Sequence, residues 1–156
     1  MVNMGEAICI LNLVTFFEHL EDHFHIPREN TDAQSLLRDC AKYNKENFSI
    51  GRRRTCFLRP ISTSEGKVYV PFERNDLLRF VKETISLGNN FPNERGHIEA
   101  TYRSNSCVGV YCTFRNGQNE SEGIETRELN GVMVVYDHES GNNIVGITAY
   151  PLYEDI

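Results

Sequence analysis

The sequence changes from helical to extended patterning at Pro92, and the extended part constrains the fold most. Four alternating or β-rich runs follow, separated by turn sequences, over residues 97–103, 106–115, 124–136 and 144–150. Asn116-Gly117 and Asn130-Gly131 are strong turn signals, and the second divides the third run into residues 123–129 and 132–136. The sequence therefore predicts a C-terminal antiparallel meander of four or five strands.

The front half of the chain carries helical spacing. Apolar side chains recur every three or four positions over residues 7–24, which predicts a first helix that Pro27 ends. Thr31 and Gln34 form a capping-box pattern at the start of a second helix. Helical structure is therefore expected to dominate the first part of the chain.

A β-hairpin is expected between the second helix and a third one. Residues 55–58 and 67–72 are the two strands, with a polar turn between them. Asn75 or Asp76 can cap the third helix, and Gly88 suits its C-terminal end.

Helices followed by a run of strands indicate an α+β fold. We expect a single domain over residues 1–156, in which N-terminal helices pack on a C-terminal four- to five-stranded antiparallel sheet. Residues 1–91 form the mainly helical part, and residues 92–156 form the antiparallel β-meander. No apolar run approaches the roughly 20 residues that cross a bilayer, which argues against a membrane-embedded chain.

Charge is unevenly distributed along the chain. Residues 92–156 contain four arginines, no lysine and ten acidic residues, so the whole formal excess of −6 lies in this part. Broad nonspecific binding of nucleic acid needs clustered Lys and Arg and is therefore not expected. A small basic pocket is still compatible with this charge, and an acidic chain also suits a basic partner.

Five cysteines, an odd number, occur without a CxxC pair. This pattern indicates reduced and mostly buried thiols in a cytoplasmic protein rather than a disulfide framework. Cys40 or Cys107 together with a histidine could instead be a nucleophile, which would make the chain an enzyme of another chemistry. No motif in the sequence supports that interpretation.

Two polar patterns in the front half each allow two interpretations. His19 and His23 have the i, i+4 spacing of a metal site, or they are solvated histidines at a helix end. The three arginines at residues 52–54, with Arg59 nearby, can hold phosphate or can form a solvated strand edge. We favour the solvated interpretation for both, because no third metal ligand is indicated and three consecutive strand residues cannot face one way.

The last strand carries polar and apolar side chains on opposite faces. Side chains alternate along a strand, so Thr148 and Tyr150 stand side by side while Val145, Ile147 and Ala149 enter the core. A hydroxyl and a phenol thereby form a small polar platform on the sheet.

His97 is the main candidate for acid–base chemistry. It begins a strand on which Glu99 and Thr101 share its face, and Arg103 continues the row. An imidazole titrates near neutral pH and can accept or donate a proton in catalysis. These groups form one site only if their strand presents the same face of a sheet as the strand of Thr148.

Further polar groups lie on the two intervening runs. Tyr111 and Arg115 face away from the apolar side of residues 106–115, and on the next strand either Thr126 or Arg127 can face the site. Solvent also produces a polar face on an open antiparallel sheet. An inert wet surface is therefore the alternative to an anion-binding site.

The end of the chain resembles a known family of small ribonucleases. Residues 123–151, GIETRELNGVMVVYDHESGNNIVGITAYP, are similar to the C-terminal strands of bacterial EndoU-type toxin domains and their relatives in the barnase–EndoU–colicin–RelE superfamily. In that family a strand with an arginine leads into an apolar strand that ends in Asp. A turn and a closing strand of the form I-V-T-A-Y-P then follow, and the present chain closes with I-V-G-I-T-A-Y-P.

The resemblance implies cleavage of RNA without a metal ion or other cofactor. In that chemistry a 2′-hydroxyl attacks the adjacent phosphate and leaves a cyclic phosphate end, which requires a base, an acid and donors for the developing charge. His97 matches the family's histidine by its place before the strands. Thr148 and Tyr150 match the closing pair, which would hold phosphate and orient the base or sugar.

The resemblance also gives roles to arginines. Arg127 would stabilise charge in the reaction, with Arg103 and Arg115 as helpers. The expected substrate-binding residues are Glu99, Thr101, Arg103, Tyr111 and Arg115. Family sites also contain a second histidine or a lysine, and no lysine follows Lys82, so the group that acts as the acid is left open.

The sequence thus predicts an endoribonuclease of toxin or effector type that acts on RNA, such as tRNA, in the cytoplasm of a target cell. Its expected protein partner is a cognate immunity protein that inhibits it. The alternative is a noncatalytic acidic binding protein, an immunity-type inhibitor whose negative surface blocks a basic toxin.

Overall fold

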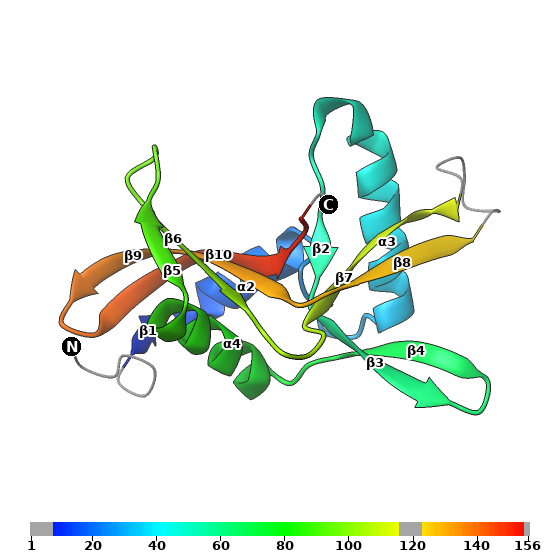
Figure 1. Cartoon of the computed structure of the whole chain (residues 1–156), viewed down its shortest axis with the longest axis horizontal. Coiled ribbons are helices and arrows are strands. Elements are labelled where there is room, and N and C mark those ends of the chain that lie inside the picture. The colour runs from blue at the N-terminus through cyan, green and yellow to red at the C-terminus, as the bar shows by residue number, and fades with distance from the viewer. Residues whose placement is uncertain (1–7, 116–122, 155–156) are drawn as a thin grey trace.

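The computed structural model describes residues 8–115 and 123–154 and confirms the α+β class. Within these residues there are three α-helices and ten strands, and Figure 1 shows how they are arranged. The turn predicted at Asn116-Gly117 lies outside the described residues. In the part of the chain that the structure describes, no helix is both long and apolar enough to span a membrane.

The larger sheet has five strands in the order β1-β10-β9-β6-β5. These strands are β1 Cys9–Leu11, β5 Asn89–Pro92, β6 Ile98–Arg103, β9 Gly131–Ser140 and β10 Asn143–Leu152. β1 pairs in parallel with β10, and the other pairs are antiparallel. The predicted division at Asn130-Gly131 is confirmed, since one strand ends at Leu129 and β9 begins at Gly131.

The strands after Pro92 do not form one continuous meander, which corrects the sequence prediction. A second sheet takes two of them, in the order β2-β7-β8. Its strands are β2 Thr55–Cys56, β7 Gly109–Phe114 and β8 Ile124–Leu129. The reason is burial, because Val110, Cys112 and Phe114 of β7 pack with α3 (Ala33–Glu46) in a separate hydrophobic cluster. β9 consequently pairs with β6 and β10 rather than with β8.

A hairpin is present before the third helix, but its first strand is not the predicted residues 55–58, because Thr55 and Cys56 form β2 and pair with β7. β3 (Leu58–Thr63) pairs antiparallel with β4 (Gly66–Pro71) and follows β2 directly along the chain. Figure 1 shows this hairpin extending away from both larger sheets. A short 3-10 helix, η1 (Phe48–Ile50), precedes β2.

The first helix is shorter than predicted. α2 spans Leu13–Asp22, whereas the sequence pattern indicated residues 7–24. Asn12 has a left-handed backbone with a φ of 55°, which separates the helix from β1. Ile8 and Ile10 are buried, because the chain before Asn12 alternates as a strand against β10 instead of continuing the helix.

The caps of the other two helices differ from those expected. Asp32, not Thr31, caps α3, and its side chain accepts a 2.7 Å hydrogen bond from the Ser35 backbone N–H. α4 spans Arg74–Leu87, and its N-cap, Glu73, makes no side-chain hydrogen bond to the helix. The predicted caps Asn75 and Asp76 therefore lie inside α4, while the expected end at Gly88 is confirmed.

A β-bulge in β10 changes which side chains face the core. The register with β9 shifts next to Ile147, which becomes an extra residue on the β10 side. Ile144 is buried before the bulge and Ala149 after it. Val145 and Ile147 are only half-buried. The predicted core face is thus correct for Ala149 and wrong for the other two, because the alternation restarts at the bulge.

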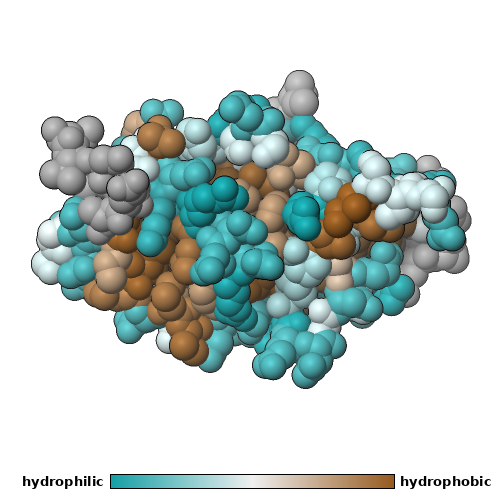
Figure 2. Space-filling view, turned by 90° about the horizontal axis from the view of Figure 1, so that it is seen from below, coloured by the Kyte–Doolittle hydropathy of each residue, from teal (hydrophilic) through white to brown (hydrophobic). Residues whose placement is uncertain are grey.

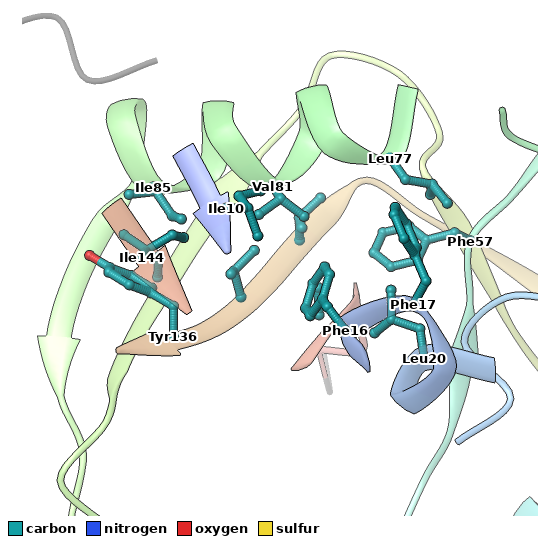
Figure 3. Close-up of a cluster of buried hydrophobic side chains, with 14 of the residues drawn as sticks. Ile10, Phe16, Phe17, Leu20, Phe57, Leu77, Val81, Ile85, Tyr136 and Ile144 are labelled. Atoms are coloured by element: carbon teal, nitrogen blue, oxygen red, sulfur yellow. The ribbon is translucent and has the colours of Figure 1, made fainter. Parts of the chain in front are cut away.

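Two hydrophobic clusters form the interior. The larger lies between α2, α4 and the five-stranded sheet, with Val81 and Ile144 among its members (Figure 3). The smaller lies between α3 and the β2-β7-β8 sheet and contains Cys40, Cys56 and Cys112. All five cysteines are free and these three are buried, as the sequence predicted.

Apolar side chains are also present at the surface. Figure 2 shows apolar areas between hydrophilic ones on the face seen from below. Val14, Leu87 and Phe91 are among the large hydrophobic side chains that are exposed. Single exposed apolar residues are normal on protein surfaces, so none of them by itself marks a docking site.

Gly109 occupies a position where a side chain does not fit. A Cβ atom there would lie 2.2 Å from Cγ of Pro151 and 2.5 Å from the carbonyl oxygen of Cys56. We expect Gly109→Ala to lower the free energy of unfolding by about 2 kcal/mol or more, because the junction of β2, β7 and β10 would be overpacked. Chemical denaturation measures this change.

Gly131→Ala is the matched control for Gly109→Ala. A Cβ atom at Gly131 would meet the Leu152 side chain at 3.4 Å, which is an ordinary contact. This substitution should change the free energy of unfolding by less than about 1 kcal/mol. Equal losses in the two variants would contradict the packing argument.

Candidate functional site

A cavity of about 940 Å³ lies over one face of the larger sheet. Its walls come from the end of α2, the segment before β2, the turn between β5 and β6, and the strands β6, β9 and β10. The polar and charged side chains that line it are His19, His23, His25, Arg53, Arg54, Asn93, Glu94, Arg95, His97, Glu99, Thr101, Thr148 and Tyr150. Four of the five histidines of the chain therefore line one space.

Strand pairing brings the predicted site residues together in two rows. Glu99 on β6 lies opposite Val135 on β9, which lies opposite Thr148 on β10. The next row runs across the same three strands from Thr101 to Tyr150. The polar faces of the first and last of these strands therefore coincide, and both line the cavity.

His97 precedes β6 and is held from two sides. Its backbone N–H donates to the Asn93 side chain at 2.9 Å, in a turn where Gly96 has a φ of 84°. Nδ1 of its ring lies 2.6 Å from Oδ1 of Asp137 on β9. An ionised carboxylate only accepts hydrogen bonds, so Nδ1 carries the hydrogen and Nε2 is left as an acceptor.

The other three histidines of the cavity form a ladder of rings that ends on Tyr150. The ring centroids are 4.2 Å apart for His19 and His23, 6.1 Å for His23 and His25, and 5.2 Å for His25 and Tyr150. His19 and His23 are half-buried groups of the cavity wall rather than solvated side chains at a helix end. Among the described residues, no group of three or more His, Cys, Asp or Glu is arranged to hold a metal ion.

His25 is the buried member of this ladder. It is only 5% exposed, and its Nδ1 donates to the carbonyl oxygen of Thr55 at 2.7 Å. Burial lowers the pKa of His25 to about 4, because a charged ring would lose its hydration. Near neutral pH the ring is therefore uncharged and stacks beside Tyr150 as a neutral aromatic group.

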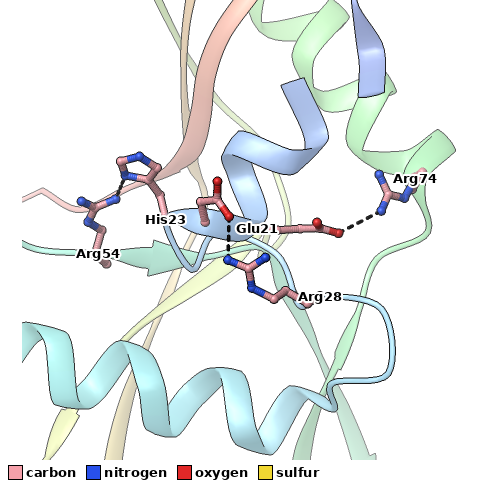
Figure 4. Close-up of polar contacts among 6 residues, drawn as sticks. Glu21, His23, Arg28, Arg54 and Arg74 are labelled. Carbon is pink, nitrogen blue, oxygen red and sulfur yellow. Dashed lines mark hydrogen bonds and ion pairs between the residues drawn. The ribbon is translucent and has the colours of Figure 1, made fainter. Parts of the chain in front are cut away.

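Arg54 is positioned by the core of the second sheet. Its backbone N–H donates to Oδ1 of Asn44 at 2.6 Å, and the Asn44 amide donates to the carbonyl oxygens of Arg54 at 3.0 Å and Cys112 at 2.8 Å. Asn44 is buried, so these bonds fix the segment before β2 against α3 and β7. The Arg54 guanidinium donates to Nδ1 of His23 (Figure 4) and lies 4.6 Å from the Tyr43 ring centroid. Burial lowers the pKa of Arg54.

Ion pairs engage the acidic side chains next to the histidines. Glu21 pairs with Arg74 of α4 at 3.2 Å, and Asp22 pairs with Arg28 at 2.6 Å (Figure 4). Exposed pairs of this kind contribute about 0–1 kcal/mol each, so their effect on stability is small. Both carboxylates face their own arginines, and neither Glu21 nor Asp22 lines the cavity that holds His19 and His23. Their negative charges therefore do not add to the charge of the cavity wall.

The cavity is locally more basic than the chain that surrounds it. Three arginines line it, Arg53, Arg54 and Arg95, against two glutamates, Glu94 and Glu99. The whole chain carries a formal charge of −6. The structure therefore contains the small basic pocket that the overall composition allowed, and this pocket suits an anionic ligand.

The remaining predicted site residues lie elsewhere. Arg103 and Arg127 line a second cavity of about 440 Å³ and do not line the first. Tyr111 packs against Tyr153, with ring centroids 4.4 Å apart. Arg115 follows the end of β7 and lines neither cavity. Tyr111, Arg115 and Arg127 are separated from His97 because β7 and β8 belong to the second sheet, whereas Arg103 lies at the opposite end of β6 from His97.

Sequence reasoning missed five basic side chains of the first cavity, namely His19, His23, Arg53, Arg54 and Arg95. The signals were the histidines at the end of α2 and the three arginines at residues 52–54. We interpreted both as solvated, and the structure corrects this because the two segments converge on the same face of the sheet. Neither the histidine spacing nor the arginine run indicates which strand its side chains will lie against.

Comparison of the chain with protein-family models, with curated proteins and with solved structures finds no match. The resemblance to EndoU-type toxin domains therefore rests on residues 123–151 alone.

The depressed pKa of His25, about 4 in the folded state against 6.5 as its ordinary value, predicts a specific loss of stability in acid. Between these values the unfolded chain binds the proton and the folded chain does not, so stability is complete above pH 6.5 and falls as the pH drops towards 4. We expect His25 to account for about 2 kcal/mol of lost unfolding free energy between pH 7 and pH 5.

Denaturant titrations at pH 7 and pH 5 measure this effect. His25→Asn should lack that part of the pH dependence, while His138→Asn should retain it, because His138 is exposed and lines neither cavity. The argument fails if the wild type and His25→Asn show the same pH dependence.

Proposed function

We propose that the protein is an endoribonuclease that cleaves RNA by attack of a 2′-hydroxyl on the adjacent phosphate, which leaves a cyclic phosphate end. The observation that carries this proposal is the content of the cavity: His97 paired with Asp137, three further histidines, three arginines, and the pair Thr148 and Tyr150. Such a set contains the base, the acid and the charge-stabilising donors that the reaction needs. The resemblance of residues 123–151 to toxin ribonucleases supports the same chemistry.

His97 acts as the general base in this mechanism. Its Nδ1 is engaged by Asp137 at 2.6 Å, so Nε2 is the nitrogen that can take the proton from the 2′-hydroxyl. Asp137 fixes the tautomer and stabilises the imidazolium that forms when the proton arrives. Proton transfer is therefore performed by a side chain just before β6, and ring orientation by a side chain on the neighbouring strand β9.

His19 is the best suited of the other histidines to act as the acid that protonates the leaving 5′-oxygen. His25 is buried, and burial holds its pKa near 4, so it is not charged near neutral pH. Nδ1 of His23 accepts a hydrogen bond from Arg54, so this nitrogen does not donate to a leaving oxygen. Within the described residues, no hydrogen bond occupies the nitrogens of the His19 ring, and the ring lines the same cavity, so it can donate to a leaving oxygen there.

Arg53, Arg54 and Arg95 stabilise the charge that develops on the phosphate. They line the cavity with His97, whereas Arg127 lines the second cavity. We therefore assign to these three arginines the charge-stabilising role that the resemblance gave to Arg127. Guanidinium groups suit it, because their planar donors match the oxygens of a phosphate.

Thr148 and Tyr150 position the substrate. Both line the cavity, on rows that lead across β9 to Glu99 and Thr101. Burial, with a smaller effect of the Glu99 charge, raises the pKa of Tyr150. The phenol therefore keeps its hydrogen and can donate to a phosphate or sugar oxygen.

The biological setting follows from the family that the chain resembles. The protein would act as a toxin or effector on RNA, such as tRNA, in the cytoplasm of a target cell, where a cognate immunity protein inhibits it. The acidic residues of the C-terminal part favour a basic inhibitor, because complementary charges steer association.

The formal charge of −6 supports a second candidate function, a noncatalytic inhibitor of a basic toxin. Such a protein binds through acidic surface and needs no histidine in a cavity. Tight capture of a basic ribonuclease, together with no RNA cleavage by the pure protein, would favour this second candidate over the first.

His97→Ala should lower the rate of RNA cleavage by at least about 100-fold, because the general base is lost. Purified protein incubated with RNA and a chelator, followed by mapping of the fragment ends, measures the rate and detects cyclic phosphates. His138→Ala is the control and should retain activity, since His138 lies on β9 outside the cavity. Cleavage that is unaffected by His97→Ala would sink the assignment of the base.

Asp137→Asn should lower kcat by about tenfold or more with little change in KM. The amide can keep a hydrogen bond to Nδ1 of His97 but provides no negative charge for the imidazolium. Glu139→Gln removes an acidic group from the same strand without touching His97 and should leave kcat unchanged. Equal kcat values for the Asp137→Asn and Glu139→Gln variants would show that the carboxylate has no part in the reaction.

A further inference from the structure

The second cavity, of about 440 Å³, carries two arginines that the proposed reaction does not use. Arg103 and Arg127 line it together with the polar side chains of Asn105, Ser106 and Asn130. We propose that this cavity is a second RNA subsite, which binds the phosphates and sugars of nucleotides that flank the cleaved bond. The inference rests on the proposed function and adds to it the substrate class, a single strand that is long enough to reach both cavities.

Tyr153 connects the two cavities. The Arg53 guanidinium, which lines the first cavity, lies 5.0 Å from the centroid of the Tyr153 ring. The Arg127 guanidinium, which lines the second cavity, also lies 5.0 Å from that centroid. Two arginines that line different cavities and approach the same ring place a surface formed by Tyr153 and the two guanidinium groups between the cavities.

This surface has the chemistry of a platform for single-stranded nucleic acid. Tyr111 packs against Tyr153 with ring centroids 4.4 Å apart, so a second aromatic ring belongs to the same group. Aromatic rings and guanidinium planes stack on bases of any identity, and arginines beside them bind the backbone phosphates. Arg103 and Tyr111, which were predicted to bind substrate, and Arg127, which was predicted to stabilise charge in the reaction, therefore serve this second subsite rather than the first cavity.

Glu154 shows how the second cavity holds an anion. Its carboxylate pairs with the Arg103 guanidinium, and its backbone carbonyl accepts a 3.0 Å hydrogen bond from Arg127. A carboxylate and a phosphate both present paired oxygens to a guanidinium. A phosphate of the RNA strand would take the place of this carboxylate, so Glu154 competes with the substrate for Arg103.

The other carboxylate of the second cavity is already neutralised. Glu128 pairs with Lys67 at 2.6 Å and accepts a 3.0 Å hydrogen bond from Tyr69. The hydrogen bond from Lys67 holds the pKa of Glu128 below its ordinary value, with the Tyr69 bond and the Lys67 charge acting in the same direction. Glu128 therefore has its own cation, which leaves Glu154 as the carboxylate that a phosphate would displace from Arg103.

Binding of DNA oligonucleotides separates this subsite from catalysis, because DNA lacks the 2′-hydroxyl and cannot be cleaved by the proposed reaction. We expect Arg103→Ala and Arg127→Ala each to weaken binding of a fluorescent strand of about ten nucleotides by roughly fivefold at low salt, and to reduce the salt slope by about one. Neither variant should change the binding of a dinucleotide. Glu154→Gln should strengthen binding of the longer strand, since it removes the competing charge.

Arg79→Ala is the matched control. It removes one positive charge from α4, and Arg79 lines neither of the two cavities. Its binding should equal that of the wild type, and all variants should show the melting temperature of the wild type. The subsite is overturned if Arg127→Ala behaves like Arg79→Ala, or if it weakens the dinucleotide as much as the longer strand.

The experiment also distinguishes the subsite from the proposed chemistry. Binding of the longer strand that depends on Arg103 and Arg127, without any cleavage of RNA by the wild type, would support the subsite and overturn the ribonuclease. Cleavage of RNA with a KM that Arg127→Ala raises only for long substrates would support both. Cleavage with a KM that no substitution in the second cavity changes would overturn the subsite alone.

Discussion

The candidate site depends on one irregularity in strand pairing, the extra residue Ile147 in β10. Ile144 and Ala149 are five positions apart and both buried, which a regular strand does not allow because its side chains alternate. The bulge resolves this conflict and leaves the hydroxyl and the phenol of the closing strand on the cavity face. Gly146, next to the bulge, also matters, because a Cβ atom there would lie 2.7 Å from the Phe16 ring. The lack of a side chain at Gly146 lets α2, which carries His19, pack close to the sheet, with His23 directly after the helix.

The parts of the site that the sequence predicts are those set by local alternation. His97, Glu99 and Thr101 share a face because they are two positions apart, and the same rule joins Thr148 to Tyr150. Long-range packing decides the rest, and it leaves no local signal. The contact of β7 with α3 carries Arg127 into the second sheet, and the end of α2 brings histidines to a strand more than a hundred residues away. The fold class was predictable from local patterns, because it depends on the order of helices and strands along the chain and not on which strands pair.

Local charge matters more than net charge for the function of this chain. An excess of −6 would by itself argue against a ligand rich in phosphate. The net charge is not spread evenly, because Glu21, Asp22 and Glu128 each form an ion pair outside the first cavity. Arg53, Arg54 and Arg95 are then directed to one hollow, where fewer carboxylates oppose them.

Both halves of the chain contribute walls to the first cavity. Arg54 is held through Asn44 by the α3 cluster, and Thr148 and Tyr150 lie on β10, the last strand of the described residues. A ribosome makes β10 after the other nine described strands, and the cavity lacks Thr148 and Tyr150 until this strand has left the exit tunnel and inserted beside β9. A nascent chain therefore carries the histidines and arginines of the first cavity before it carries the surface that would align a ligand against them. The order of synthesis delays assembly of the pocket until this segment has emerged from the ribosome.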